Sequence, residues 1–397
     1  MSGVGGAVGG AVVTGYGAVT ALGDAGATWD GVLVGRCAAR SWQDLADEGF
    51  TATTACRVTH VPVGDPVRRG RDLAGRAVLD ALASAGLAPD FAQDLDPSRV
   101  GVFVGTTMGE SAGFELAGAS GVPVDPDELS GWGIATHVAR LVGATGTTRA
   151  YGTACAAGSY AIGAAAAAVR AGRLDVAVAG GVEPFSRIAM TGFSRMRAMT
   201  PDVCRPFTAG RRGMQIGEGA GFVVVEPEHR VALRASRAPV RSRAVVGPLG
   251  LASDAHHPTS PRPDGSGMAA AMSAALGRGG VLPTAVGWVS AHGTGTAQSD
   301  AAEALALRSV FPSGVPVSSV KGAIGHTMGA ASAIETVLAV RALEEGLAPP
   351  NVNGTEPDPG LGIDVVVRPY AADLRWVLNC AYAFGGLDSA LLLGRVA

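Results

Sequence analysis

The sequence predicts an α/β protein made of two similar halves, and three observations support this fold class. Short apolar runs typical of buried strands alternate with helical segments along the chain. Each half also contains glycine-bounded turns that carry a chemically reactive side chain. With 397 residues, the chain is too long for one ordinary core and fits two units of about 200 residues. We therefore expect one half over residues 1–237 and a second over residues 238–397, divided within the Arg- and Pro-rich stretch 230–243.

The first half alternates buried strands with helices. We expect strands at 11–19, 100–105, 175–181 and 219–226, helices at 28–34, 66–86 and 134–142, and an alanine-rich helix that follows Cys155 and runs to Arg170. Continuous apolar strands such as 175–181 are typical of a sheet that is covered on both faces. Residues 115–133 are rich in Gly, Pro and Asp, and we expect a loop there.

The second half repeats this alternation. We expect strands at 244–247, 287–290, 315–318, 363–367, 376–383 and 389–393, and helices at 267–276, 300–310 and 327–345. The last two strands follow one another closely and should pair. The repeated order of strands and helices is the basis for the predicted duplication.

Composition and charge exclude several classes of function. The formal net charge is only −3, which argues against bulk nucleic-acid binding. No apolar run reaches the roughly 18 residues of a membrane span without a charge or a helix breaker, and the first residues lack the basic start of a signal peptide. The five cysteines are scattered, with no CxxC pair and no metal-ligand spacing. We therefore expect a cytoplasmic protein without a metal or a membrane partner.

Cys155 stands out because of its neighbours. It lies among very small residues just before the alanine-rich helix, so its sulfur is uncrowded. The unpaired N–H groups at a helix N-terminus favour a thiolate, and we expect them to depress the thiol pKa. The alternative is a buried structural cysteine, since free cysteines are among the most buried residues.

Two histidines occupy comparable settings in the second half. His292 follows a predicted strand and enters the Gly/Thr turn that ends at Thr296, and His326 opens another helix rich in small residues. Lys321, five residues before His326, is the only lysine among 31 basic residues. An ammonium and a guanidinium are not interchangeable in a tight site, so this lysine suggests a role specific to its position. His60, His137, His229, His256 and His257 lack such settings, and we expect surface or packing roles for them.

A site with one thiol, two imidazoles and a lysine suits acyl transfer followed by a second step in which a carbonyl oxygen must be stabilised. The thiol can hold an acyl group covalently. Neutral imidazoles can then donate N–H bonds to a thioester oxygen as enolate charge develops. A Cys/His protease would need only one histidine, oriented by an Asn or Asp.

Four motifs together resemble those of the elongating β-ketoacyl-[acyl-carrier-protein] synthases. They are Thr153-Ala-Cys155-Ala-Ala-Gly, Ala291-His292-Gly-Thr-Gly-Thr296, Lys321-Gly-Ala-Ile-Gly-His326 and Ala383-Phe384-Gly-Gly386. They lie in register over roughly 230 residues, and the resemblance extends from about residue 11 to residue 394. It implies a thiolase-type fold, in which two similar halves form five αβαβα layers, and usually a dimer.

The resemblance also implies roles for individual residues. Cys155 would take an acyl chain from the phosphopantetheine of an acyl carrier protein. His292 and His326 would support the decarboxylation of malonyl carrier protein, whose carbanion attacks the Cys155 thioester. Lys321 would order the site with Glu335 as its partner. No cofactor of the protein itself is implied.

The remaining site residues follow from the same resemblance. The backbone N–H groups of Cys155 and Phe384 would form an oxyanion hole, and the Phe384 ring would gate the acyl tunnel. Thr294 and Thr296 match positions that bond the pantetheine arm. Met108 matches a position at the end of the tunnel near the dimer interface.

Docking of the carrier protein is implied at three arginines. Arg68, Arg69 and Arg205 lie where the family presents basic residues to an acidic carrier protein. The alternative is that these arginines belong to an ordinary solvated surface. The other implied partner is a second subunit, either a copy of this chain or a related ketosynthase or chain-length factor.

The chain departs from the family pattern around the gating loops. Thr208 stands where Asp is usual, Arg211-Arg212-Gly replaces Arg-Asp-Gly, Ala383 replaces Gly, and Leu387-Asp388 replaces Thr-Asn. These departures favour a specialised type II polyketide or polyene pathway over general fatty-acid synthesis. Two alternatives stay open: a chain-length-factor-like partner of another ketosynthase, and an acyltransferase that does not condense.

Overall fold

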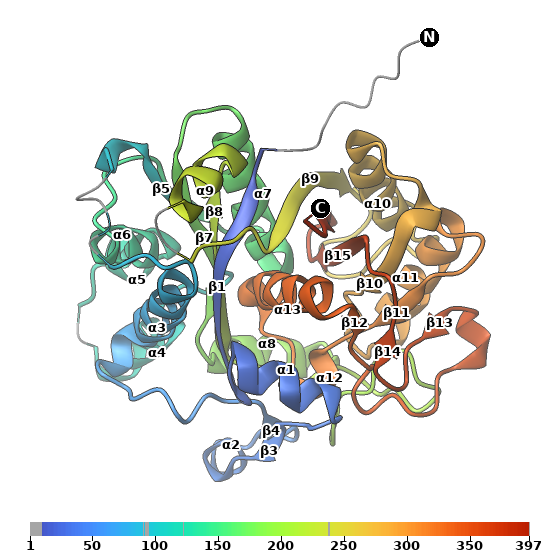
Figure 1. Ribbon diagram of the computed structural model, residues 1–397. Coiled ribbons are helices and arrows are strands. Elements are labelled where there is room, and N and C mark those ends of the chain that lie inside the picture. The colour runs from blue at the N-terminus through green and yellow to red at the C-terminus, as the bar shows by residue number, and fades with distance from the viewer. Residues whose placement is uncertain (1–9, 90, 92–94, 122, 237–238, 397) are drawn as a thin grey trace.

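The computed structural model describes residues 10–89, 91, 95–121, 123–236 and 239–396. Its main feature is a twelve-stranded mixed sheet, eleven strands of which follow the order β13-β11-β10-β15-β16-β9-β1-β8-β7-β5-β6, while β2 pairs with β1 (Figure 1). The strands of this sheet are β1 (Val12–Thr20), β2 (Gly23–Asp24), β5 (Val100–Gly105), β6 (Thr148–Tyr151), β7 (Val176–Glu183), β8 (Gly219–Glu226), β9 (Ala244–Ser253), β10 (Val286–Ser290), β11 (Pro316–Ser318), β13 (Asp364–Val365), β15 (Trp376–Ala383) and β16 (Leu387–Gly394). Two small pairs complete the strands: β3 (Arg40–Ser41) with β4 (Thr54–Ala55), and β12 (Leu347–Ala348) with β14 (Tyr370–Ala371).

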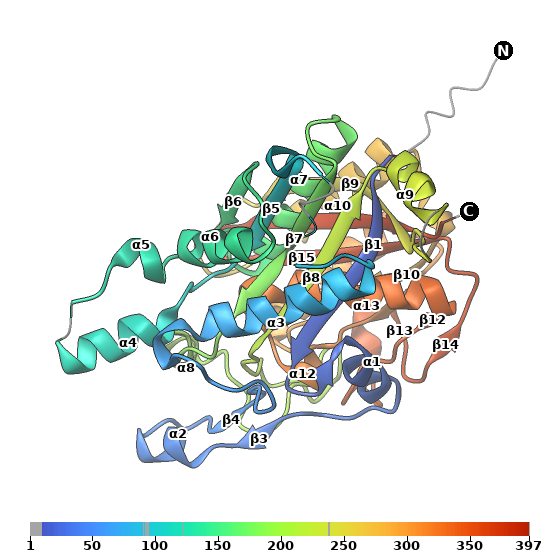
Figure 2. The same cartoon turned by 60° about the vertical axis from the view of Figure 1, so that its left-hand side comes forward.

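The helices surround and separate the two parts of the sheet (Figure 2). They are α1 (Ala25–Leu33), α2 (Gln43–Asp47), α3 (Arg69–Ser84), α4 (Ser111–Ser120), α5 (Pro126–Leu129), α6 (Gly131–Leu141), α7 (Ala157–Arg170), α8 (Arg187–Arg195), α9 (Glu228–Ala235), α10 (Ser266–Gly279), α11 (Ala297–Val310), α12 (Lys321–Ile324) and α13 (Ala331–Glu345). Short 3-10 segments lie at η1 (Pro66–Arg68), η3 (Pro97–Arg99), η4 (Ala154–Ala156), η5 (Pro283–Ala285), η6 (Met328–Ala330) and η7 (Pro359–Leu361). Among the described residues, no helix has the length and apolarity that crossing a membrane requires.

The sheet consists of the same five-strand arrangement made twice. In the first half the order is β1-β8-β7-β5-β6, and in the second it is β9-β16-β15-β10-β11. The first two pairings are antiparallel and the next two are parallel in both halves. Antiparallel pairing of β1 with β9 joins the halves into one sheet. The predicted duplication is therefore confirmed, although the predicted boundary between residues 237 and 238 lies outside the described residues.

Three apolar cores give the fold five layers. The inner core holds α7 and α13 between the two halves of the sheet, with alternate residues of β7 such as Ala177 and Ala179 facing it. The intervening residues of β7, including Val176 and Val178, face an outer core with α3 and α6. A third core packs α10 and α11 on the outer face of β15 and β16. Strands covered on both faces explain the continuous apolar runs in the sequence, and the αβαβα arrangement is confirmed.

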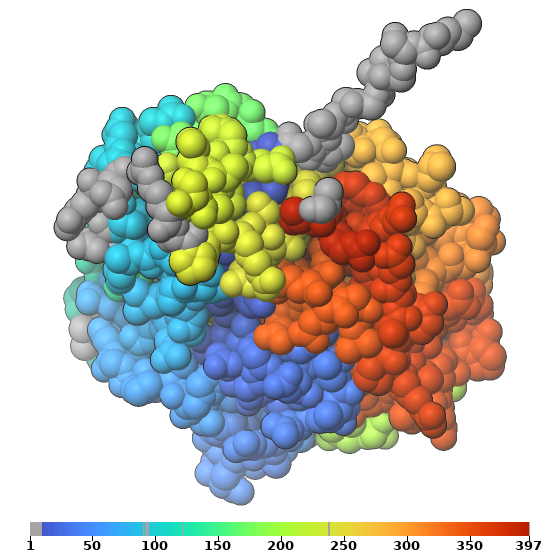
Figure 3. All heavy atoms as spheres, viewed as in Figure 1, coloured from blue at the N-terminus to red at the C-terminus, as the bar shows by residue number. Residues whose placement is uncertain are grey.

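Small residues let the two central helices approach closely. A Cβ at Gly158 of α7 would lie 2.7 Å from the backbone nitrogen of Ala333 in α13, closer than packed atoms allow. The backbone N–H of Ser159 also donates to Oγ of Ser332 at 2.9 Å. The Ala/Gly composition around Cys155 therefore has a packing reason as well as a chemical one. Figure 3 shows the two halves side by side on one face of the molecule.

The prediction of a loop at residues 115–133 is wrong. Helix α4 ends there at Ser120, and α5 lies entirely within the segment. Gly121 ends α4 in the left-handed conformation, and the Asp125 side chain caps α5. The turn-forming residues that suggest a loop are therefore the helix ends.

Candidate active site

Cys155 lies in a tight turn between β6 and α7. The turn is η4, and Ala154 within it has a φ of +47°. A positive φ is strained for a residue with a side chain, so the surrounding packing must hold this turn. Cys155 packs against Ala381 and Ala383 at the end of β15, in the opposite half. The sulfur is therefore fixed where the two halves meet.

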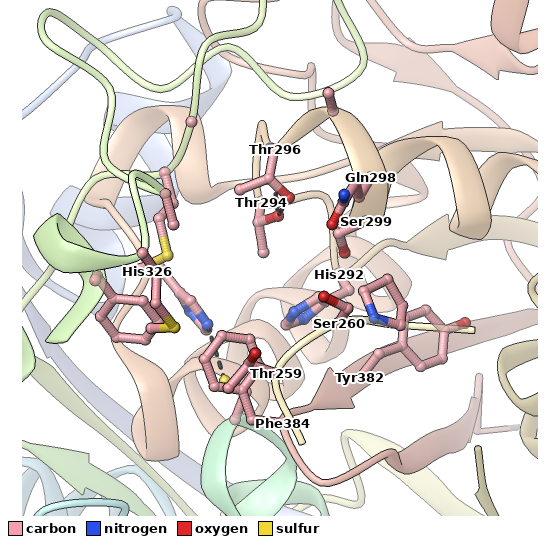
Figure 4. A pocket seen from close by; sticks show the side chains of 18 of the residues that line it. Thr259, Ser260, His292, Thr294, Thr296, Gln298, Ser299, His326, Tyr382 and Phe384 are labelled. Atoms are coloured by element: carbon pink, nitrogen blue, oxygen red, sulfur yellow. Dashed lines mark hydrogen bonds between the residues drawn. The ribbon is translucent and has the colours of Figure 1, made fainter. Parts of the chain in front are cut away.

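Both predicted histidines lie beside the cysteine. Nε2 of His326 is 3.1 Å from Sγ of Cys155, and the rings of His292 and His326 meet edge to face with centroids 5.3 Å apart. Figure 4 shows the two rings in the pocket and the dashed contact from His326 to the sulfur. The fold thus brings together three side chains that are far apart in the sequence.

A buried carboxyl group holds the turn that carries His292. The backbone N–H groups of His292 and Gly293 each donate to Glu303 at 2.8 Å. Asp300 accepts from the N–H of Gly295 at 3.1 Å in the same turn. Burial raises the pKa of Glu303 to about 8 and that of Asp300 to about 6, while these amide donors act in the opposite direction. Sequence reasoning missed both acids, although their place in the first two turns of a helix just after the Gly/Thr turn was an available signal.

The backbone of His326 is anchored to the first half of the chain. Its N–H donates to the carbonyl of Gln215 at 2.6 Å, and the N–H of Gly217 donates to the carbonyl of His326 at 3.0 Å. The Gly217-Glu-Gly-Ala-Gly221 stretch thus continues into strand β8 after supporting the histidine.

Lys321 forms a buried ion pair with the partner expected for it. Its Nζ lies 2.5 Å from Oε1 of Glu335, and the two side chains are 1% and 2% exposed. Burial raises the pKa of Glu335, and the Lys321 charge opposes that shift. Removing either partner would leave a buried charge without compensation.

Burial controls the protonation of the three reactive side chains. It lowers the pKa of His292 and of His326 well below the usual value, and the Lys321 charge lowers both further. Both imidazoles are therefore neutral at pH 7. Burial raises the pKa of the Cys155 thiol to about 12, and Lys321 offsets only part of this rise. The expectation of a depressed thiol pKa is thus wrong, because the desolvation of the thiolate outweighs the helix terminus.

The three side chains open into a cavity of about 550 Å³. Its wall includes three more of the predicted site residues, Thr294, Thr296 and Phe384. The two threonine hydroxyl groups are 3.0 Å apart. Phe384 is 39% exposed and packs against Phe193 with ring centroids 5.6 Å apart. A cavity of this volume suits a small-molecule substrate.

Met108 itself does not line this cavity, but it packs in an apolar cluster with Phe193, which does, and with Phe185 and Met328. Its backbone N–H donates to Oε1 of Glu183 at 2.9 Å. The predicted tunnel role of Met108 stays a prediction.

The three arginines predicted for docking differ in their surroundings. Arg68 is exposed and pairs with Glu128 at 2.6 Å, and Arg205 is part-exposed and pairs with Asp202 at 2.6 Å. Arg69 is only 7% exposed, and its guanidinium donates to Glu218 at 3.0 Å. The docking prediction is therefore wrong for Arg69, because its charge is neutralised inside the protein.

Sequence reasoning missed one more buried acid near the cysteine. Glu183 ends β7, and its Oε2 accepts the N–H groups of Thr107 and Gly329, each at 2.8 Å. Burial raises its pKa to about 7. An acid that ends an apolar strand was the available signal, but the amides it meets come from distant segments.

Within the part of the chain that the structure describes, one group of three side chains is close enough to hold a metal ion. It consists of Cys155, His292 and His326, whose potential ligand atoms lie within 4.8 Å of one another. These are the same groups that the acyl chemistry would use. The expectation of a metal-free site stays a prediction.

The duplicated fold and this site define a thiolase-like condensing enzyme, with a thiol and two neutral imidazoles at the bottom of one cavity. Comparisons with known proteins agree. Residues 66–230 match the family described as "Beta-ketoacyl synthase, N-terminal domain", and residues 243–355 match "Beta-ketoacyl synthase, C-terminal domain".

Individual relatives match along nearly the whole chain. Nodulation protein E of Rhizobium sp. (strain N33) is 33% identical, over 97% of this chain and 99% of the relative. The 3-oxoacyl-[acyl-carrier-protein] synthase 2 of Rhizobium meliloti (strain 1021) is also 33% identical, over 97% and 98%. The chain belongs to the β-ketoacyl synthase family.

Solved structures give the same result. The structure titled "The ishigamide ketosynthase/chain length factor" has a TM-score of 0.89 and 35% identity, and the match covers 98% of this chain and 99% of that one. A type II PKS acyl-carrier protein in complex with its ketosynthase, bound to the hexaketide, matches with a TM-score of 0.88 and 27% identity, again over 98% and 99%.

Proposed function

We propose that the protein joins a Cys155-bound acyl chain to malonyl-acyl carrier protein by a decarboxylative Claisen condensation, giving a β-ketoacyl-acyl carrier protein. One observation carries the proposal: Sγ of Cys155 lies 3.1 Å from Nε2 of His326, in a cavity that also holds a second neutral imidazole. The relatives named as 3-oxoacyl-[acyl-carrier-protein] synthases support it.

In the first step the thiol becomes acylated. Because burial keeps the thiol protonated, His326 would take its proton through the 3.1 Å contact as the sulfur attacks the incoming thioester. A new carbon–sulfur bond forms to Cys155, the bond to the phosphopantetheine sulfur breaks, and the proton from His326 leaves with that thiol. The backbone N–H groups of Cys155 and Phe384 would bind the oxyanion.

In the second step the malonyl group loses CO2. The electron pair of the broken carbon–carbon bond passes into the thioester as an enolate, whose oxygen would accept N–H bonds from His292 and His326. The enolate carbon then attacks the Cys155 thioester, and the carbon–sulfur bond to Cys155 breaks. The Cys155 thiolate released in this way takes up a proton from water, and the enzyme returns to its starting state.

Other residues would support these steps without taking part in bond changes. Burial lowers the pKa of both imidazoles, and the charge of Lys321, held by Glu335, lowers it further, which favours their neutral form. Thr294 and Thr296 would bond the pantetheine arm where they line the cavity. The substrate arrives on the phosphopantetheine of the carrier protein, and the chemistry needs no cofactor or metal of the protein's own.

The partners would be an acyl carrier protein and a second subunit. The exposed Arg68 and the part-exposed Arg205 are the arginines proposed to meet the acidic carrier protein. The second subunit would be another copy of this chain or a related ketosynthase or chain-length factor, as in the similar heteromeric structures. The departures at Thr208, Arg212 and Asp388 support a specialised polyketide or fatty-acid pathway.

The alternatives account for fewer of the residues. A chain-length-factor-like partner does not need a nucleophile, yet Cys155 is present with both histidines. An acyltransferase without condensation does not need two imidazoles that face one enolate oxygen.

Release of CO2 from malonyl-acyl carrier protein tests the proposal. We expect His292→Ala and His326→Ala each to lower the rate of CO2 release by about 10²-fold or more, because each removes a donor to the enolate oxygen. His229→Ala is the matched control, because this exposed histidine lies outside the cavity. Wild-type rates in both active-site variants would rule the proposed roles out.

A further inference from the structure

Two buried aspartates face each other in the wall of the acyl cavity, and the proposed chemistry uses neither. Asp254 directly follows β9, and Asp388 is the second residue of β16. They are 5% and 1% exposed, and both line the cavity that contains Cys155. Two buried acids side by side require an explanation, because like charges repel strongly away from water.

The geometry of the two carboxyl groups indicates a shared proton. Oδ1 of Asp254 and Oδ2 of Asp388 converge over Gly267, at 2.1 and 2.5 Å from the position that a Cβ there would occupy. Among the described residues, neither oxygen meets an N–H or O–H group. The two buried oxygens can therefore be satisfied only by each other, through a hydrogen bond between the carboxyl groups. A hydrogen bond between two acceptors exists only if one of them carries a proton.

Asp254 connects this pair to the two loops of the cavity wall. Its Oδ2 accepts the N–H of Arg262 at 2.7 Å, and its own N–H donates to the carbonyl of Gly386 at 2.9 Å. The N–H of Gly385 donates to the carbonyl of Pro258 at 2.8 Å. Two backbone hydrogen bonds thus join the loop 254–262 to the turn after Phe384, and the carboxyl pair joins the same loop to the start of β16, directly after that turn.

The surroundings favour the protonated form of Asp388. The titratable side chains that face it are Asp254, Tyr160 of α7, and Cys380 and Tyr382 of β15. Burial raises the pKa values of Tyr160, Cys380 and Tyr382, so these groups are neutral at pH 7. The pKa of Asp388 is raised to about 8 by burial and by the neighbouring Asp254. The pair therefore keeps its proton at pH 7 and loses it as the pH rises through 8.

We propose that Asp388 is a positioning residue: one proton shared with Asp254 locks the loop 254–262 to the Phe384 turn and so holds the wall of the acyl site. The link to acylation rests on the proposed function, because the wall faces Cys155. An asparagine at position 388 would supply an N–H donor that does not titrate. The aspartate would make this wall sensitive to pH.

Acylation of Cys155 as a function of pH tests the positioning role. The rate constant for acylation by an acyl-loaded carrier protein is measured from pH 6.5 to 9.5 for the wild type, Asp388→Asn and Asp254→Asn, each normalised to its own value at pH 6.5. Relative to both variants, the acylation rate constant of the wild type should fall about tenfold between pH 7 and pH 9. The reason is that the protonated fraction of Asp388 falls by that factor around a pKa of 8. The ionisation of Cys155 and the histidines is common to all three proteins and cancels in the ratio. Parallel profiles would overturn the positioning role.

Thermal unfolding tests the shared proton independently of any enzyme activity. A folded-state pKa above the usual value means that the folded protein holds an extra proton between about pH 4 and pH 8, so its stability falls as the pH rises through that window. The Tm of the wild type relative to Asp388→Asn should therefore fall from pH 5 to pH 8. Asp264→Asn, two residues after this loop and outside the cavity wall, should run parallel to the wild type, because its pKa of about 2 leaves it ionised throughout. If the difference in Tm between the wild type and Asp388→Asn stayed constant with pH, the proposal of a shared proton would be overturned, even if acylation were never detected.

Discussion

The two halves of the molecule each contain a strained turn at the start of a central helix, but only the first turn has a reactive side chain at its centre. In the first half Ala154 has a φ of +47° and precedes Cys155, and α7 follows. In the second half Met328 has a φ of +42° and precedes Gly329, and α13 follows. The sequences Thr153-Ala-Cys155-Ala-Ala and Thr327-Met-Gly329-Ala-Ala align at these turns. Gly329 therefore occupies the position that corresponds to the cysteine.

The two turns differ in the residue that ends the neighbouring strand, and this difference explains why a cavity opens beside only the first turn. The second turn lies against the end of β7, where the Glu183 carboxyl group accepts the N–H of Gly329 at 2.8 Å. The first turn lies against the end of β15, where the last residue is Ala383 and a cavity opens instead. Glu183 thus accepts the N–H of Gly329 in the second turn, whereas the corresponding N–H of Cys155 in the first turn lies beside a strand that ends in Ala383, which has no side-chain acceptor. The same backbone conformation serves packing in one half and, in the proposed function, acyl chemistry in the other.

A side chain at the second turn should break the packing role. In Gly329→Ala the added Cβ would lie 2.5 Å from the backbone nitrogen of Thr107 and 2.7 Å from backbone atoms of Thr106. Because backbone atoms cannot rotate away, we expect a loss of about 1–3 kcal/mol in unfolding free energy, measured by urea denaturation. Gly118→Ala is the control, since nothing lies within 4 Å of that helical position. An equal stability of Gly329→Ala and the wild type would mean that the second turn is not tightly packed.

Removal of the acid should show a smaller, pH-dependent effect. Glu183→Gln offers only one oxygen to the three amide N–H groups, and we expect a loss of about 1–2 kcal/mol near pH 5. Because burial raises the pKa of Glu183 to about 7, the folded wild type holds an extra proton between the usual glutamate range and pH 7. Wild-type stability should therefore fall towards that of the variant as the pH rises from 5 to 7. The exposed Glu356→Gln is the control, and a gap that widens with pH would contradict this account of Glu183.

Much of the fold and the main site residues could be predicted because their signals are local. Apolar runs marked the central strands, and the glycine-rich turns marked Cys155, His292 and His326. The single lysine led to Lys321, and the resemblance led to Glu335, which lies 2.5 Å from it. These features are specified by residues adjacent in the sequence, or by a motif with fixed spacing.

The errors and omissions concern burial, which depends on distant parts of the chain. Desolvation raises the Cys155 pKa against the local effect of the helix terminus. Arg69 belongs to a basic stretch, yet Glu218 from far along the sequence neutralises it. The carboxyl pair of Asp254 and Asp388 arises only because β9 and β16 are neighbours in the sheet. No local sequence pattern predicts a contact between side chains of such distant strands.

The central claim is that Cys155, and not another thiol, holds the acyl chain. Intact-protein and peptide mass spectrometry after incubation with an acyl-loaded carrier protein tests it most directly, with Cys155→Ala beside the partly exposed Cys37→Ala as matched control. We predict one acyl increment on the wild type and on Cys37→Ala, located on the peptide that contains Cys155, and none on Cys155→Ala. An increment that persists in Cys155→Ala, or that maps to another cysteine, would contradict the account.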